Sequence, residues 1–153
     1  MILDGEIILI DNDRFEYDFL KEALQRLDYT VDVVYLQNAK EGYEYLKRTK
    51  KEIFLIISEI DFNHSGGFAL KDALNKDEDT RLKSIPFVFI ANFISKPVVD
   101  AAYNYQIQGL FVKPAKINEL TDLFSTIIKY WIINVHPNKS EAFYMPAGWR
   151  AQE

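Results

Sequence analysis

Five short apolar runs, separated by longer segments of helical period, place the strongest constraint on how this chain can fold. The runs are Ile7–Ile10, Val31–Leu36, Ile53–Ile57, Phe87–Ile90 and Gly109–Val112. Strands of this length that alternate with helices are typical of βαβ units and of a parallel sheet. The third run is apolar throughout, as expected for a central strand that is covered on both faces of the sheet.

The segments between the runs show three- and four-residue spacing of apolar side chains. Asp13 and Glu16 have the spacing of a capping box, which predicts the start of the first helix. Asn38 is expected to cap the second helix. The remaining helices are expected at Phe68–Leu74, Val98–Gln106 and Ile117–Ile133. The whole pattern predicts a flavodoxin-like, doubly wound α/β domain with a five-stranded parallel sheet, five helices and three α/β/α layers.

Composition narrows the classes of protein to which the chain can belong. With 153 residues it fits one domain, which we predict at residues 1–135, followed by a tail at residues 136–153 that is partly ordered or disordered. The net charge of −5 supplies no basic face for nucleic acid. The absence of cysteine suits a reducing cytosol, and no apolar stretch reaches the roughly 20 residues of a membrane span. We therefore expect a cytoplasmic protein that binds neither nucleic acid nor membrane.

Polar residues follow several of the apolar runs. Asp11 ends the first run within an acidic turn that continues with Asn12 and Asp13, and Glu59 follows the third run. Ala91 and Lys113 directly follow the fourth and fifth runs and are the other candidate site residues at run ends. Because the carboxyl ends of parallel strands meet at one edge of the sheet, we expect these side chains to share one pocket. In contrast, His64 and His136 have neither metal-ligand spacing nor a nucleophile partner, and both are expected at the surface.

Across residues 6–134 these positions together resemble the receiver domain of the response-regulator family, in its single-domain, chemotaxis-regulator-like form. Asp11 matches the first metal-site acid of the family, and Lys113-Pro114 matches a Lys-Pro pair whose peptide bond is cis in the family. Gly67-Phe68 matches a Gly-aromatic pair that fixes the register of the acceptor. The final helix, with Tyr130 and Trp131, resembles that of phytochrome-type single-domain regulators.

The chain departs from the family pattern at the reacting positions. Glu59 falls on the phosphate-accepting Asp, and its extra methylene moves the carboxylate by about 1.5 Å. A displacement of that size can cost about 100-fold in rate. Asn12 falls on an acid that ligates Mg²⁺, and Ala91 falls on a Ser or Thr that hydrogen-bonds the phosphoryl group. The resemblance thus leaves Asp11, Asn12 and Glu59 as candidate ligands of a weakly held Mg²⁺, with no other cofactor implied.

Three hypotheses about function follow. The first is a non-enzymatic pseudo-receiver, held in one conformation by a Glu59–Lys113 ion pair, that acts through protein–protein contact in a bacterial two-component pathway. The second is a working phosphorelay receiver that takes phosphate from a histidine kinase at Glu59 or Asp61. The third is a flavodoxin-like scaffold outside phosphorelay. A further alternative is that Glu59 is a drift product in an inactive pocket.

Aromatic and apolar residues near the end of the sequence mark a candidate interface. The face formed by Val98–Gln106, Gly109–Val112 and Ile117–Ile133 is one that receivers use to dimerise or to bind other signalling proteins, including a histidine kinase. The candidate interface residues are Tyr103, Tyr105, Leu110, Phe111, Tyr130 and Trp131. Exposed aromatic clusters favour interfaces, although helical spacing also suits each of these residues to the core.

Overall fold

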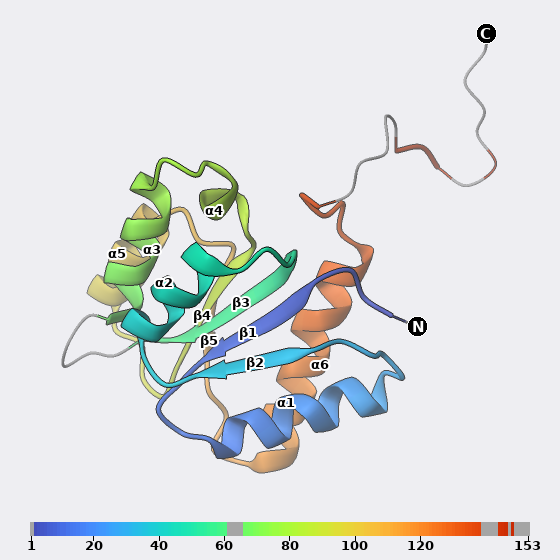
Figure 1. Cartoon of the computed structure of the whole chain (residues 1–153). Helices are drawn as coiled ribbons and strands as arrows, with labels where there is room; N and C mark the ends of the chain where they lie inside the picture. Colours follow the sequence, from blue (N-terminus) through green and yellow to red (C-terminus); the bar gives the residue numbers. More distant parts are fainter. Residues whose placement is uncertain (1, 61–65, 139–143, 147, 149–153) are drawn as a thin grey trace, which may run out of the picture.

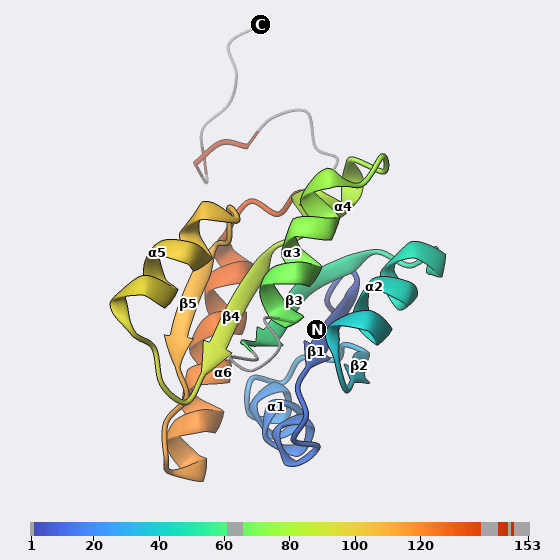
Figure 2. The same cartoon turned by 90° about the vertical axis from the view of Figure 1, so that its left-hand side faces the viewer.

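The computed structural model describes residues 2–60, 66–138, 144–146 and 148. Within these residues the chain forms a five-stranded parallel sheet in the order β2-β1-β3-β4-β5 (Figures 1 and 2). The strands are β1 (Glu6–Ile10), β2 (Val33–Leu36), β3 (Ile53–Glu59), β4 (Phe87–Ala91) and β5 (Gly109–Val112). β1 pairs with both β2 and β3, so the chain reverses its direction of winding at the carboxyl end of β1. The predicted flavodoxin-like class is confirmed.

Helices cover both faces of the sheet, which gives the three layers that the sequence predicts. The part of the chain that the structure describes contains α1 (Phe15–Arg26), α2 (Ala39–Arg48), α3 (Gly66–Lys76), α4 (Arg81–Ser84), α5 (Lys96–Asn104) and α6 (Ile117–Ile133). α4 is one helix more than the sequence predicts. It forms because the Asp79 carboxylate accepts a hydrogen bond from the Arg81 N–H, and because the buried Leu82 anchors the single turn.

Two hydrophobic cores lie on opposite faces of the sheet, and alternate residues of each strand point into them. Ile7 and Leu9 pack against α1 and α6, whereas Ile8 and Ile10 pack against the helices of the other face. All of these side chains are at most 4% exposed. Burial on both faces explains why β1 and β3 are nearly continuous apolar runs in the sequence.

The starts of the first two helices differ in how well the sequence predicts them. Asn38 caps α2 as expected, because its side chain accepts from the Glu41 N–H at 2.9 Å. The capping box predicted for α1 is wrong. Asp13 accepts from the Phe15 N–H at 2.9 Å, but the Glu16 carboxylate turns inward and forms an ion pair with Lys113 instead of returning to the backbone.

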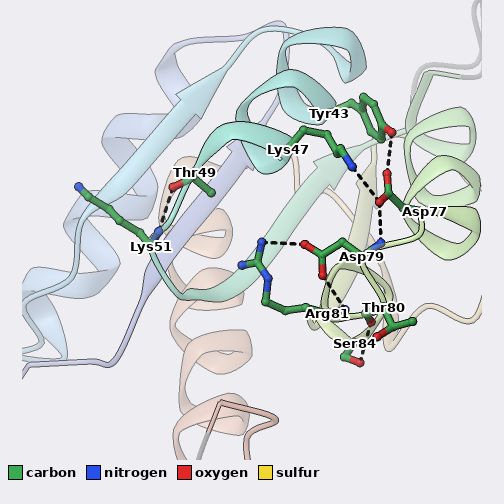
Figure 3. A network of polar contacts seen from close by, with 9 residues as sticks. All are labelled: Tyr43, Lys47, Thr49, Lys51, Asp77, Asp79, Thr80, Arg81 and Ser84. Atoms are coloured by element: carbon green, nitrogen blue, oxygen red, sulfur yellow. Dashed lines mark hydrogen bonds and ion pairs between the residues drawn. The ribbon is translucent and has the colours of Figure 1, made fainter.

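A polar network ties α2 to the end of α3 (Figure 3). The Asp77 carboxylate accepts from the Tyr43 hydroxyl at 2.7 Å and from the Lys47 ammonium at 2.9 Å. The Asp79 N–H donates to the same carboxylate at 2.9 Å. The hydrogen bonds from Tyr43 and Lys47 lower the pKa of Asp77 to about 2. Asp77 therefore stays ionised at neutral pH and holds the two helices together.

The segment after α6 docks against the amino end of β3. His136 is 5% exposed, its ring stacks on Phe54 at 4.9 Å, and its Nε2 donates to the Phe54 carbonyl oxygen at 2.6 Å. Asn138 donates to the Ile53 carbonyl oxygen at 2.9 Å. The expectation of a surface His136 is thus wrong, because the ring finds an aromatic partner and a backbone acceptor. A cavity of about 160 Å³ adjoins this contact and is lined by Ile2, Leu3, Phe54, Trp131, His136 and Asn138, among others.

Candidate functional site

The parallel sheet brings several of the predicted site residues to one edge. Asp11 follows β1 directly, Glu59 and Ala91 are the last residues of β3 and β4, and Lys113 follows β5. The Lys113 Nζ lies 3.3 Å from Asp11 Oδ2 and 3.2 Å from Glu59 Oε1. The Lys113 backbone N–H also donates to the Ala91 carbonyl oxygen at 2.7 Å, which fixes the start of the loop after β5.

Lys113 has a further partner, Glu16, which its spacing from Asp13 predicts in a capping box and not in the pocket. Glu16 lies on the first turn of α1, is 2% exposed, and forms an ion pair with the Lys113 ammonium. Lys113 itself has a side chain that is 8% exposed. The ammonium is therefore enclosed by the carboxylates of Asp11, Glu16 and Glu59, which come from different elements of the fold.

The burial of these charges shifts their pKa values. Burial, reinforced by the hydrogen bond and the charge of Glu16, raises the pKa of Asp11 to about 7. The pKa of Glu59 is also raised, first by burial and then by the charge of Asp11, against the opposing effect of Lys113. For Lys113, burial lowers the pKa, but the hydrogen bond to Glu16 and the surrounding carboxylates outweigh that effect and raise it. The lysine therefore remains charged while Asp11 titrates near neutral pH.

The rest of the acidic turn lies outside this cluster. Asn12 and Asp13 are both exposed. The Asp13 N–H donates to Asp11 Oδ1 at 2.7 Å, so the turn orients Asp11 through its backbone. Ala91 is 1% exposed and presents a methyl group where the resemblance implies a hydroxyl. The structure thus brings together Asp11, Glu59 and Lys113, and leaves Asn12 and Asp13 at the surface.

The pocket does not fit the Mg²⁺ that the resemblance implies. Among the described residues, no group of three or more His, Cys, Asp or Glu side chains is arranged to hold a metal ion. The Lys113 ammonium is the cation on which the carboxylates converge, and Asn12 supplies an amide where a carboxylate would be preferred. We therefore derive no step through a metal ion.

Gly67, which the resemblance uses to fix the register of the acceptor, packs closely against its neighbours. A Cβ at this position would meet the Phe89 ring at 2.8 Å and the Glu59 carbonyl oxygen at 2.9 Å. The expected cis bond at Lys113-Pro114 is wrong, because none of the peptide bonds in the described part of the chain is cis. An X–Pro bond ordinarily favours trans by about 0.5–1 kcal/mol. Asp61, the alternative acceptor, lies outside the described residues.

The candidate interface residues divide by exposure. Tyr103 on α5 and Tyr130 on α6 are 53% and 56% exposed. Trp131 is 7% exposed and belongs to the core beneath α6, so its assignment to the interface is wrong. Helical spacing explains this, because Trp131 continues the inward-facing series of Phe124, Ile127 and Ile128. The half-buried candidates that pack against the two cores are Tyr105, Leu110 and Phe111.

A doubly wound parallel sheet with acids at the carboxyl ends of β1 and β3 and a lysine after β5 defines a signalling module of the receiver class. The sequence model of the response regulator receiver domain matches residues 7–125. The chain belongs to this family, and it is a receiver domain of the two-component signalling type. Receiver domains interact with histidine kinases and other signalling proteins, and they are generally non-enzymatic.

The chain is also similar in sequence to individual regulatory proteins. The chain is 24% identical over 123 residues to the two-component response regulator ARR10 of Arabidopsis thaliana, an alignment that covers 80% of this chain and 21% of that protein. It is 21% identical over 132 residues to the probable methanogenesis regulatory protein FilR2 of Methanothrix harundinacea, an alignment that covers 82% of this chain and 83% of that protein. The chain spans about a fifth of the length of the Arabidopsis relatives that it matches.

Solved structures show the same fold at low identity. The phosphorylated cyanobacterial phytochrome response regulator RcpA matches with a TM-score of 0.80 and 19% identity, over 89% of this chain and all of that chain. The Mn²⁺-bound form of response regulator Rcp1 matches with a TM-score of 0.74 and 17% identity, over 86% and 96% of the two chains.

None of the helices in the described part of the chain is both long enough and apolar enough to cross a bilayer.

Proposed function

We propose that this chain is a pseudo-receiver, which acts in a two-component or related cytoplasmic pathway by binding a protein partner and without being phosphorylated. The observation that carries the proposal is the enclosure of the Lys113 ammonium by Asp11, Glu16 and Glu59. The Lys113 ammonium is compensated by carboxylates of the chain itself, and the raised pKa values of Asp11 and Glu59 relieve the excess of negative charge, so we infer that the pocket can stand without a phosphoryl group or a metal ion.

The chemistry of the reacting positions supports the same proposal. Phosphoryl transfer to a carboxylate needs a positioned nucleophile and a cation that neutralises the developing charge. Glu59 carries its carboxylate one methylene further from the backbone than Asp would, and that carboxylate already contacts Lys113 at 3.2 Å. At the end of β4, the Ala91 side chain has no group with which to hydrogen-bond a phosphoryl oxygen. A pocket of this kind favours one fixed conformation over a phosphorylation switch.

The partner surface that we propose is the face formed by α5, β5 and α6. Tyr103 and Tyr130 project from its two helices and are more than half exposed. Large exposed aromatic side chains are common at protein interfaces because they bury much area at little entropic cost. A histidine kinase, another signalling protein or a second copy of this chain would each fit such a face, and Tyr103→Ala together with Tyr130→Ala is expected to weaken the interaction.

The deciding experiment exposes the protein to acetyl phosphate with Mg²⁺, and separately to beryllofluoride, and follows intact mass and amide NMR spectra. We expect no added phosphate and no spectral shift. Glu59→Asp serves as the matched variant, because it restores the shorter carboxylate while leaving the rest of the sequence intact. Any response that is confined to this variant would support the proposal.

A phosphate on the unmodified chain would refute the proposal and favour the second candidate, a working receiver that accepts phosphate at Glu59 or Asp61. Peptide mapping of the modified residue would then separate these two acceptors. The locking contact has its own test. Glu59→Gln should change the conformation of the pocket or the binding of the partner, and if it changed neither, the Glu59–Lys113 contact would have no functional part.

A further inference from the structure

Glu16 is an acid at a position where a core-facing residue would be expected. On α1 it lies in line with Leu20, Ala23 and Leu24, which all pack into the core between the helix and the sheet. A carboxylate in such surroundings is costly unless a cation or hydrogen-bond donor compensates it. Lys113 supplies that cation, and the contact joins the first turn of α1 to the loop that leads into α6.

The carboxylates around Lys113 differ in their access to water. The side chains of Asp11 and Glu16 are 0% and 3% exposed, whereas the Glu59 side chain is 19% exposed. Because attraction between charges strengthens as the local dielectric falls, the more deeply buried Glu16 should bind the ammonium more strongly than Glu59 does.

A second property of Glu16 points the same way. One of its oxygens, Oε2, is buried and has no hydrogen-bond partner among the described residues while Asp11 is ionised. An unsatisfied buried oxygen lowers stability, so Glu16 is not explained as a residue that merely fills space. Its other oxygen, Oε1, is the one that contacts the Lys113 ammonium.

We propose that Glu16 is an internal ligand of Lys113: a carboxylate from α1 that holds the ammonium, so that Lys113 responds less to the charge at position 59 than to the charge at position 16. This inference deepens the proposed function and rests on it, since it names the contact that keeps the pocket in one state. Glu59 then has a secondary role, and Glu16 is the positioning residue that fixes Lys113 and the loop after β5.

The test compares Glu16→Gln with Glu59→Gln, which each replace a carboxylate by a neutral side chain of the same length. The readout is the rate at which an acetylating reagent labels the Lys113 amine as a function of pH, measured by mass spectrometry of peptides. We expect Glu16→Gln to raise this rate about tenfold, the effect of lowering the lysine pKa by one unit, and Glu59→Gln to raise it less.

Glu22→Gln is the control, because Glu22 lies on the same helix in an exposed ion pair with Arg26. This variant should leave Lys113 labelling unchanged. If Glu59→Gln accelerates labelling as much as Glu16→Gln does, or if Glu16→Gln has no effect, the proposal is overturned. Should Glu16→Gln fail to fold, nuclear Overhauser contacts between the Glu16 γ and Lys113 ε protons of the unmodified protein decide the matter. Their presence supports the contact, and their absence overturns it.

The labelling experiment contains no phosphate donor, so it fails or succeeds independently of the proposed function. Phosphorylation of the unmodified chain would refute the pseudo-receiver while leaving the Lys113 labelling result unaffected. Equal effects of Glu16→Gln and Glu59→Gln would remove the special place of Glu16 and leave a phosphorylation-independent module intact.

Discussion

Replacing Asp11 by Asn is expected to flatten the dependence of protein stability on pH. Asp11 is 1% exposed, and its pKa is raised from 3.8 to about 7 in the folded protein. Between these two pH values the folded chain keeps a proton on Asp11 that the unfolded chain has already released. The folded state therefore binds more protons in this window, and its stability falls as pH rises from about 4 to about 7.

The size of the effect follows from the shift. Each unit of pKa difference corresponds to about 1.4 kcal/mol, so the Asp11 contribution should fall by about 2–3 kcal/mol between pH 5 and pH 8. Asn keeps an oxygen that can accept from the Asp13 N–H, as Asp11 Oδ1 does at 2.7 Å, but it does not titrate. The difference in unfolding free energy, Asp11→Asn minus parent, should thus increase by that amount over the same range.

Urea unfolding followed by circular dichroism at pH 5, 6, 7 and 8 measures this difference. Glu59 is present in both proteins, so its contribution to the pH dependence of stability largely cancels in the comparison. The cancellation is incomplete because the Asp11 charge is one cause of the raised Glu59 pKa, and that cause is absent in Asp11→Asn. The reasoning would be refuted if the two proteins gave parallel curves of stability against pH. A parallel result would mean that Asp11 is already ionised at pH 5, and that Lys113 compensates its burial completely.

Three further substitutions test other parts of the structure. Asp77→Asn should lower stability at pH 7, where the hydrogen bond from Tyr43 favours the ionised carboxylate, and should remove the stability that the parent loses as pH falls from about 4 to about 2; unfolding curves at pH 7 and pH 3 measure both effects. Gly67→Ala should destabilise the fold by about 1–3 kcal/mol, since the new methyl group meets the Phe89 ring, and an unchanged melting temperature would contradict this packing. His136→Ala should cost about 1–3 kcal/mol because a carbonyl of β3 loses its donor, whereas undiminished stability would argue against docking of the segment after α6.

Much of the fold could be predicted because strand and helix periods are local properties of the sequence. The apolar runs fall within a few residues of the observed strands, and Asn38 caps α2 as its position suggests. α4 was missed because it is a single turn that depends on one side-chain hydrogen bond and on the burial of Leu82. The docking of His136 was missed because its partner Phe54 lies 82 residues away in the sequence, and no local pattern announces such a contact.

The candidate site was only partly predictable. Strand ends converge in any parallel sheet, which is why Asp11, Glu59 and Lys113 could be grouped from the sequence alone. Glu16 was assigned to a capping box, since its distance from Asp13 suits that motif. A signal was nonetheless present: Glu16 stands four residues before Leu20 on the apolar stripe of α1. An acid on a core-facing stripe indicates a buried partner, and this pattern should take precedence over capping when the two conflict.

The cavity beside His136 bears on whether the chain can be circularly permuted or inserted into another protein. Ile2 and Asn138 both line it, so the residues before β1 and those after α6 are neighbours at the amino edge of the sheet, away from the acidic pocket. Domains with adjacent ends commonly tolerate circular permutation and insertion into a host chain. A short linker between these ends would allow the backbone to be opened elsewhere. The domain could thus be built into another protein as a single inserted unit whose Lys113 pocket lies at the opposite edge of the sheet from the junction.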